Sequence, residues 1–445
     1  MCRSDVLAVA RCFLAILIIA GPTFAEDQVG ERYEGNPIAI VDVTVIDVSD
    51  GTATPHQSVV VRYGRIAYVK PAGEFDTPGW MTEVNGGGRF LIPGLWDAHV
   101  HLSFWDEPEG EGSTADSESV KNDYGEVLGR LAAWGITSVR DMGGDLEAID
   151  DWRGRIDKGE VAGPTVLRAG PYIDGPKEND RYRRFVTSSD EARDAVRELD
   201  EAGVDLLKIH SQIPAEAMPA LAKEAKKRGL RIGGHVPYGT SIGELVDWGV
   251  STVEHVDVFF ISRLGSRQGT FEDWKAAYDW HFTPEGDKLF EKMEAGGMWY
   301  TPTLAIFDSG WDGVGEPWNK LRTWYRDLAG LAHRKGVRLL AGTDLARKTG
   351  TVQPGNGLHD ELEHLVDIGL EPWEALRAAT LYPARAFGRE SEVGAIKPGM
   401  IGDLVLLAGN PLEEIRETRN IEAVVIRGRL LDDKRLSALR ASDGP

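Results

Sequence analysis

The sequence predicts an α/β fold: a (β/α)8 TIM barrel inserted in a small composite β-sandwich domain that the N- and C-terminal segments form together. Between residues 94 and 390, short apolar runs alternate with amphipathic helical stretches, which is typical of parallel βαβ units. On either side, residues 26–93 and 391–445 carry short β patterns separated by Gly and Pro turns. A chain of 445 residues is long enough for both parts to bury a core.

Residues 1–25 match the pattern of a signal peptide. Arg3 and Arg11 precede the apolar run CFLAILIIAG (12–21), and the small residue Ala25 ends the stretch PTFA at a suitable cleavage point. The apolar run is about half the length that a membrane-spanning helix requires, so a permanent anchor is the weaker alternative. We therefore expect an exported protein, periplasmic or secreted, without stable membrane insertion.

The amino-acid composition limits the kinds of molecule that this protein is expected to bind. Lys and Arg total 50 against 71 Asp and Glu, and a formal net charge of −21 repels the phosphates of nucleic acid. Cys2 and Cys12 both lie in the predicted signal peptide, so the mature chain would have neither disulfides nor thiolate metal ligands. We expect a small-molecule substrate and no nucleic acid, and the sequence leaves a homo-oligomer open.

The composite β domain is expected from two separated segments. The first contains IAIVDVTVIDV, QSVVVRYGRIAYV and RFLIPG before residue 95. The second contains GAIKPGMIGDLVLLAGN and IEAVVIRGRLL from residue 394 onward. Both have the short alternating or continuous apolar runs of strands, so we expect the C-terminal segment to rejoin the N-terminal one.

Eight candidate strands support the barrel. They span residues 94–102, 135–143, 164–173, 204–210, 231–236, 251–257, 298–304 and 337–344. The segment PAEAMPALAKEAKKRGL (214–230) between two of them opens with Pro and closes with basic residues and Gly, as helix ends prefer. After the first strand, the acidic segment 106–119 is expected to be a solvated loop.

Lys208 lies inside the apolar run GVDLLKIHS (203–211). Burial of an ammonium group is costly unless the group is paired, deprotonated or chemically modified. Taken alone, such a lysine is more often a side chain that extends from a strand end to water. The residues at neighbouring strand ends decide between these interpretations.

Four histidines and one aspartate lie near the carboxyl ends of predicted strands, where barrels of this kind place their active sites. These residues are His99, His101, His235, His255 and Asp344. His99 and His101 are two positions apart on a strand, so both side chains face the same side. Each histidine alone is readily explained as a neutral core residue, but together the set favours a site for zinc or a similar divalent ion.

The chain resembles the amidohydrolase superfamily, specifically its binuclear-metal branch and the exported dipeptidase-like and imidazolonepropionase-related group. The resemblance covers nearly the whole mature chain. It is carried, in order, by LIPGLWDAHVHL, TSVRDMGG, DLLKIH, GGHVPYG, VEHVD, LLAGTD, LHDELEHLVDIGLEPWEALRAATLYPAR and GAIKPGMIGDLVLL.

This resemblance implies a centre of two divalent metal ions, most often zinc. His99 and His101 would bind the more buried ion and His235 and His255 the more exposed one. Asp344 would be a ligand and the catalytic proton shuttle. Lys208 would bridge both ions as a carbamate formed with carbon dioxide.

Physical chemistry is consistent with the carbamate, because burial favours a neutral amine and a neutral amine can capture carbon dioxide. Two divalent ions, a carbamate, Asp344 and a bridging hydroxide would leave the site mildly positive, which attracts an acyl oxygen. The ions would lower the pKa of the bridging water towards about 7, and Asp344 would pass its proton to the leaving group.

The resulting expectation is a metal-dependent hydrolase that cleaves the amide bond of a dipeptide or an N-acyl amino acid. The same centre also suits a lactonase, an esterase or a phosphotriesterase, and a non-catalytic binding protein on this fold is the second alternative. Deamination is less favoured, because Val236, Pro237 and Tyr238 follow His235 where deaminase relatives usually carry a glutamate.

Substrate contacts are harder to identify. Candidates from the predicted rim are Arg140, His210, Tyr238, Tyr300, Arg347 and His359. His210 shares a strand face with Lys208, although a structural role is an equal alternative. The aromatic segment 259–282 is interpreted either as a pocket wall that favours apolar side chains or as ordinary packing over outer helices.

Overall fold

The computed structural model describes residues 36–74, 76–104, 124–176, 182–309, 318–346 and 352–441. The predicted signal peptide, the acidic segment 106–119 and Arg347 lie outside these ranges. None of the helices in the described ranges is long and apolar enough to cross a bilayer.

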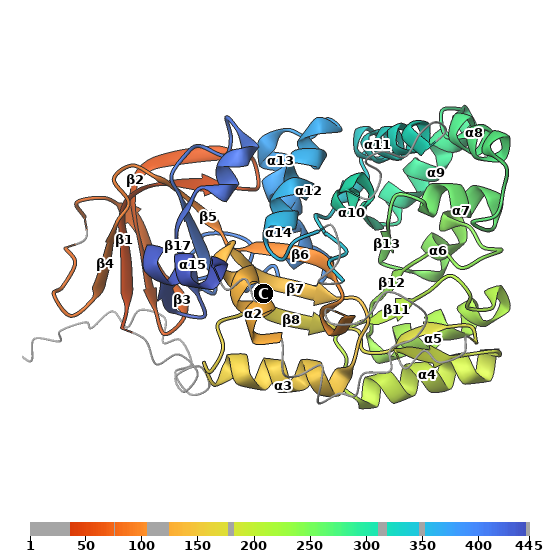
Figure 1. Cartoon of the computed structure of the whole chain (residues 1–445), viewed down its shortest axis with the longest axis horizontal. Coiled ribbons are helices and arrows are strands. Elements are labelled where there is room, and N and C mark those ends of the chain that lie inside the picture. Colours follow the sequence, from red (N-terminus) through yellow and green to blue (C-terminus); the bar gives the residue numbers. More distant parts are fainter. Residues whose placement is uncertain are drawn as a thin grey trace, which may run out of the picture.

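The N- and C-terminal segments share one eight-stranded sheet, at the left of Figure 1. Its strands are β1 (Ile38–Asp47), β2 (Thr52–Arg62), β3 (Arg65–Pro71), β4 (Thr82–Asn85), β5 (Phe90–Pro93), β16 (Leu404–Leu407), β17 (Ile421–Ile426) and β18 (Arg429–Leu431). Their order is β18-β17-β16-β5-β1-β2-β3, with β4 beside β1. β5 joins the two segments, because it pairs in parallel with β1 and antiparallel with β16.

The two faces of this sheet belong to different cores. In β16, Leu404 and Leu406 join a core within the β domain, whereas Val405 and Leu407 join the core of the barrel. A strand that is buried on both faces has a continuous apolar sequence, as LVLL does. The β domain is therefore packed against the barrel through its own sheet.

Eight parallel strands form the barrel. They are β6 (Leu95–Val100), β7 (Ile136–Asp141), β8 (Thr165–Arg168), β11 (Leu207–Ile209), β12 (Ile232–Gly234), β13 (Thr252–Glu254), β14 (Trp299–Thr301) and β15 (Arg338–Leu339). Each lies inside the corresponding predicted run, and the predicted barrel fold is confirmed. The run 164–173 also contributes to a further strand, β9 (Tyr172–Asp174), which pairs with β10 (Arg183–Phe185) and β11.

Backbone hydrogen bonds close the ring at its two seams. Asp205 N–H donates to the carbonyl of Arg168 at 2.9 Å, between β8 and β11. Ala98 N–H donates to the carbonyl of Ala341 at 2.9 Å, between β6 and the end of β15. The short strand assignments therefore belong to one closed ring.

Helices surround the barrel, and short helices precede β17 and end the chain (Figure 1). The barrel helices are α2 (Tyr124–Ala133), α3 (Leu146–Asp157), α4 (Ser189–Glu201), α5 (Met218–Arg228), α6 (Ile242–Trp248), α7 (Val258–Leu264), α8 (Phe271–Trp280), α9 (Pro284–Ala295), α10 (Leu304–Ser309), α11 (Trp318–Arg334), α12 (Asn356–Asp367), α13 (Pro372–Ala378) and α14 (Leu381–Ala386). The remainder are η1 (Leu102–Phe104), η2 (Ala215–Ala217), η3 (Ile415–Arg419) and α15 (Asp433–Arg440).

Local sequence explains where these helices end. The helix expected over 214–230 consists of η2 and α5, and Gly229 closes it in the left-handed conformation at φ +73°. Ser241 and Glu244 form a capping box at the start of α6. The aromatic segment 259–282 becomes α7 and α8, where Phe260 stacks on Trp274 with ring centroids 4.8 Å apart.

One glycine connects the β domain to the barrel. Gly94 stands alone between β5 and β6, and its N–H donates to the carbonyl of Asp403 at 2.8 Å. A Cβ at this position would lie 2.1 Å from Thr137 Oγ1, which is closer than two non-bonded atoms can approach. Strand β6, which carries His99, therefore follows the terminal sheet with only Gly94 between them.

Candidate metal centre

The six predicted metal ligands come from five carboxyl strand ends of the barrel. His99 and His101 lie at the end of β6, Lys208 is in β11, His235 follows β12, His255 follows β13 and Asp344 follows β15. Parallel strands in a closed ring bring these ends together although up to 245 positions of sequence separate them, as Asp344 and His99 illustrate.

Side-chain nitrogens and oxygens of this set converge. Asp344 Oδ1 lies 3.4 Å from His99 Nε2 and 3.5 Å from His101 Nε2. The Nε2 atoms of His235 and His255 are 3.1 Å apart. Ligand atoms of His99, His255 and Asp344 all lie within 4.8 Å of one another, a spacing that suits a shared cation.

Each imidazole is oriented through its other ring nitrogen. The Nδ1 atoms lie 3.2 Å from Glu254 Oε2 for His99, 2.9 Å from the Gly143 carbonyl for His101, 3.1 Å from Ser211 Oγ for His235 and 3.0 Å from Thr303 Oγ1 for His255. Such partners fix the ring and direct Nε2 toward a metal. All four histidines are therefore arranged as ligands.

Burial sets the protonation of the centre. It lowers the pKa of His101 to about 3 and holds the pKa values of His99, His235 and His255 well below the ordinary range. These imidazoles are neutral at physiological pH, which is the form that binds metal. Burial also raises the pKa of Asp344 to about 7 and lowers that of Lys208 to about 8.

Two side-chain nitrogens at the centre, on Lys208 and His99, are buried and available for a ligand. Lys208 is 1% exposed, and among the described residues its Nζ has no hydrogen-bond partner. His99 Nε2 is likewise buried without a hydrogen-bond partner in the described part of the chain. Unsatisfied buried polar atoms are rare and mark a functional group or a ligand. The donor set of imidazoles, a carboxylate and a modifiable amine therefore fits divalent ions.

Two of the predicted ligands have an unusual backbone. His255 has φ +77° and Asp344 has φ +56°, and Thr303, which bonds to His255, has φ +53°. Side chains other than glycine rarely adopt this region, and such strain clusters at functional sites. The strand ends turn sharply here, which directs both ligands into the barrel mouth.

A buried ion pair lies beneath the centre. Arg140 donates to Glu254 Oε2 at 2.8 Å and to Thr252 Oγ1 at 2.9 Å, and the same Glu254 oxygen lies 3.2 Å from His99 Nδ1. Arg140 and Glu254 are fully buried. The prediction that Arg140 contacts substrate is therefore wrong, since its guanidinium supports the floor of the site.

Two more predicted substrate contacts are also wrong. Tyr300 is fully buried and packs against Phe259 of α7 with ring centroids 5.1 Å apart, because alternation along β14 turns it outward from the barrel. His359 is buried in α12, where Nδ1 lies 2.9 Å from Thr418 Oγ1 and Nε2 lies 3.1 Å from the Trp134 carbonyl.

The cavity at the centre has a volume of about 300 Å³. It is lined by His101, Tyr172, Lys208, His210, His235, His255, Arg267, Phe307 and Asp344. His210 is thus in the cavity, with Nδ1 3.1 Å from Asp174 Oδ2, whereas Tyr238 is not among its lining residues. Arg347 lies outside the described residues.

Three lining residues were missed from the sequence. Tyr172 is the next-to-last residue of the predicted strand 164–173, so the sequence already indicated a position at the rim of the barrel. Phe307 follows strand seven in a segment that carries no motif, whereas Arg267 lies in the aromatic segment 259–282, for which a pocket wall was one of the two interpretations. Glu254 was also missed, although a carboxylate in the apolar run STVEHVD gives the same signal as Lys208.

The sequence model of the amidohydrolase family matches residues 90–431, which is most of the chain. The chain belongs to the amidohydrolase family. It is accordingly a hydrolase that acts on carbon–nitrogen bonds.

Two curated relatives have low sequence identity to this chain. Ochratoxinase from Aspergillus niger is 23% identical over 450 residues, covering 87% of this amidohydrolase and 84% of the relative. Adenine deaminase from Rubrobacter xylanophilus is 24% identical over 403 residues, and the match covers 87% of this chain but only 56% of the deaminase. This amidohydrolase thus spans little more than half the length of that deaminase.

Solved structures support the same fold. A prolidase complexed with N-methylphosphonate-L-proline has a TM-score of 0.72 at 22% identity, covering 89% of this chain and 100% of the other. An Xaa-Pro dipeptidase with bound methionine in its active site has a TM-score of 0.71 at 20% identity, covering 89% and 100%. At these identities the likeness concerns the fold.

Proposed function

We propose that this amidohydrolase uses two divalent metal ions, most often zinc, to hydrolyse the amide bond of a dipeptide or an N-acyl amino acid. The observation that carries the proposal is one cavity lined by five of the six predicted ligand side chains together with a guanidinium and two aromatic rings. The prolidase and dipeptidase among the structural neighbours support this substrate class.

Each predicted ligand has a place in the proposed centre. His99 and His101 would hold the more buried ion, and His235 and His255 the more exposed one. Lys208, carbamylated by carbon dioxide, would bridge the two. Bound divalent ions supply a nucleophilic water at neutral pH and polarise the carbonyl group of the substrate.

Asp344 is positioned to move a proton. Its carboxylate lines the cavity beside the imidazoles, 3.4 Å from His99 Nε2, where an acid–base group can reach a bound substrate. In the proposed reaction Asp344 accepts a proton as the nucleophile adds and gives it to the departing amine.

Arg267 gives the cavity a substrate preference. Its guanidinium is held by Asp257 at 2.7 Å, yet the side chain remains 46% exposed at the cavity wall. A guanidinium recognises a carboxylate with two parallel hydrogen bonds. We therefore assign Arg267 to the free carboxylate of the amino-acid part, with Tyr172 and Phe307 beside the apolar part.

A hydrolysis screen tests the proposal. The mature, zinc-loaded protein is offered dipeptides, N-acyl amino acids and, for comparison, esters, lactones and phosphotriesters. Amide hydrolysis that exceeds ester and lactone hydrolysis is expected. Turnover confined to lactones, esters or phosphotriesters would show that these compounds, and not amides, are the substrates. Fewer than about one metal ion per chain, with no activation by added zinc, would contradict the proposal of a metal-dependent enzyme.

Export is a separate proposal that rests on the N-terminal sequence. The charged start, apolar run and small residue at Ala25 match a cleaved signal peptide. We expect the mature protein to begin near Glu26 in the periplasm or the medium. Sequencing the N-terminus of the protein from its native host tests this, and an intact first 25 residues would contradict it.

A further inference from the structure

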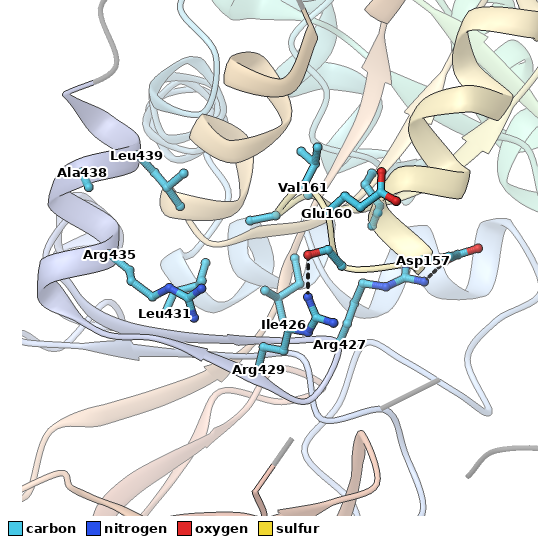
Figure 2. A pocket seen from close by; sticks show the side chains of 14 residues that line it. Asp157, Glu160, Val161, Ile426, Arg427, Arg429, Leu431, Arg435, Ala438 and Leu439 are labelled. Atoms are coloured by element: carbon cyan, nitrogen blue, oxygen red, sulfur yellow. Dashed lines mark hydrogen bonds and ion pairs between the residues drawn. The ribbon is translucent and has the colours of Figure 1, made fainter. Parts of the chain in front are cut away.

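A second cavity, of about 310 Å³, lies where the barrel meets the C-terminal segment (Figure 2). One wall is the end of α3 and the loop 157–163, and the other is formed by β17, β18 and α15. We call it the seam cavity. It shares no lining residue with the metal centre, and its loop leads into the start of β8, at the amino-terminal face of the barrel.

Three arginines of the C-terminal segment line the seam cavity. Arg427 is paired with Asp157 and donates to Thr165 Oγ1 at 3.2 Å. Arg429 donates to the Gly159 carbonyl at 3.1 Å, and Arg435 approaches the Leu430 carbonyl at 3.5 Å. Figure 2 shows the three guanidinium groups along the same side of the cavity.

Arg429 and Arg435 form no ion pair with a carboxylate in the described part of the chain. Both arginines are exposed at the edge of the cavity, so their remaining N–H groups face solvent. Glu160 also lines the cavity, but Figure 2 shows its carboxylate turned away from both arginines. Two guanidinium groups thus retain donors for an anion.

The rest of the lining is apolar. Ile156, Ile426 and Leu431 are 3–4% exposed and form the floor, and Val161 and Leu439 pack at the edge. A cavity of this volume falls at the lower end of the range that binds small organic molecules. The guanidinium groups therefore provide hydrogen-bond donors at one side of a cavity whose remaining lining is apolar.

We propose that the seam cavity binds a small organic carboxylate that carries an apolar chain or ring. The carboxylate would accept hydrogen bonds from Arg429 and Arg435, while the apolar part would cover Ile156, Ile426 and Leu431. A single negative charge matches the site better than a polyanion, because Arg427 is already paired with Asp157 and Glu160 adds a further negative charge to the lining. The ligand would contact both the barrel and the C-terminal segment and so stabilise their junction.

Octanoate and its neutral analogue octanamide test this with the full, metal-loaded protein. Calorimetry should show saturable octanoate binding and a higher melting temperature, with octanamide weaker. Replacing both arginines (Arg429→Gln with Arg435→Gln) should weaken octanoate binding by about tenfold or more and leave turnover unchanged. Arg416→Gln, which alters an exposed arginine paired with Glu363, is the matched control and should bind as the parent does.

Two outcomes would overturn the proposal. One is octanoate affinity that is equal in the parent and in the double variant, or in the single variant Arg435→Gln if the double variant does not fold. The other is loss of octanoate binding in Lys208→Ala, which would place the anion at the metal centre instead. Retained binding in Lys208→Ala, together with loss in the arginine variants, would assign the carboxylate to the seam cavity.

Discussion

Arg140 and Lys208 are two buried basic side chains near the carboxyl ends of the barrel strands, and they differ in whether the protein satisfies their hydrogen-bond donors. Arg140 is paired with Glu254 and bonds to Thr252, so its charge and donors are satisfied by the protein. Lys208 Nζ has no hydrogen-bond partner among the described residues, although Glu254 and Asp344 raise its pKa against the effect of burial. Arg140 therefore has a structural role, whereas the unsatisfied Lys208 is the group that we expect to bind the metal ions.

Substitution of Lys208 should therefore abolish the metal centre. We expect Lys208→Ala to lose bound metal and turnover, and Lys208→Arg to restore neither, because a guanidinium cannot form a carbamate. Elemental analysis and amide hydrolysis measure both effects. Lys226→Ala, at an exposed position of α5, is the control. A Lys208→Ala protein with two ions and full turnover would exclude the bridge.

Glu254 should act as a positioning residue for His99. Glu254→Gln keeps the shape but leaves Arg140 as an uncompensated buried charge, which costs about 3–5 kcal/mol of stability. It also weakens the partner of His99 Nδ1, so zinc affinity should fall by about 10- to 100-fold. Competition with a chelator and chemical unfolding give both values. Unchanged zinc affinity would mean that Glu254 only stabilises the fold, and Glu272→Gln on the exposed side of α8 is the control.

At the scale of elements, close backbone contact fixes the spacing between ligand-bearing strands. Gly234 ends β12 at φ +142°, directly before His235, and a Cβ there would lie 2.1 Å from the Ile209 carbonyl of β11. β11 also carries Lys208, so the absence of a side chain at Gly234 lets two ligand strands approach. The ligands that follow β13 and β15 reach the same centre by left-handed backbone turns at His255 and Asp344 instead.

Gly234→Ala should consequently separate β11 from β12. We expect a loss of about 2–4 kcal/mol in the free energy of unfolding and weaker metal binding, because His235 moves relative to Lys208. Gly154→Ala is a suitable control, since nothing lies within 4 Å of a Cβ there and the residue is inside α3. That control should gain up to about 1 kcal/mol. Equal stability of the two variants would contradict the close-contact argument.

The turn between β17 and β18 should give the fold a pH dependence. Asp403 precedes β16 and accepts the Arg427 N–H at 2.8 Å, and burial raises its pKa to about 6. A raised carboxyl pKa means that the folded state holds the proton more tightly, so this group's contribution to stability falls as pH rises from about 4 to about 6.

Asp403→Asn removes this titration and retains an acceptor oxygen. The free energy of unfolding of the variant minus that of the parent should therefore increase by up to about 3 kcal/mol as the pH rises from 4 to 7. Denaturant unfolding at the two pH values measures the difference. A difference between parent and variant that does not change with pH would show that Asp403 keeps an ordinary pKa in the fold.

For the whole molecule, metal binding and stability should be linked, because the proposed ligands come from five strands of one ring. We expect chelation to lower the melting temperature and abolish turnover, and zinc with bicarbonate to restore both. Lys208→Ala should melt at one temperature with or without chelator. A parent protein whose melting temperature is indifferent to chelator and zinc would contradict a structural contribution of the ions.

Sequence patterns predicted the barrel strands well because their runs are short and apolar, and five of the eight end at a predicted metal ligand. The ligand set followed from the same strand ends, and the structure brings those side chains together. Substrate contacts were predicted poorly. Arg140 and Tyr300 depend on which way a strand residue points, and His359 depends on how α12 packs against η3, none of which has a local signature. Arg267 lines the cavity from the aromatic segment 259–282, for which a pocket wall was one of two interpretations, although this residue was not named.

The single residue between β5 and β6 limits how this enzyme can be dissected. Moving the terminal sheet would also displace β6, the strand that contains His99, because the single residue Gly94 is too short a linker to absorb the movement. The catalytic barrel is therefore a poor candidate for transplantation as a free-standing unit. Engineers who shorten the protein should preserve both terminal segments, or supply a replacement strand that anchors residue 94.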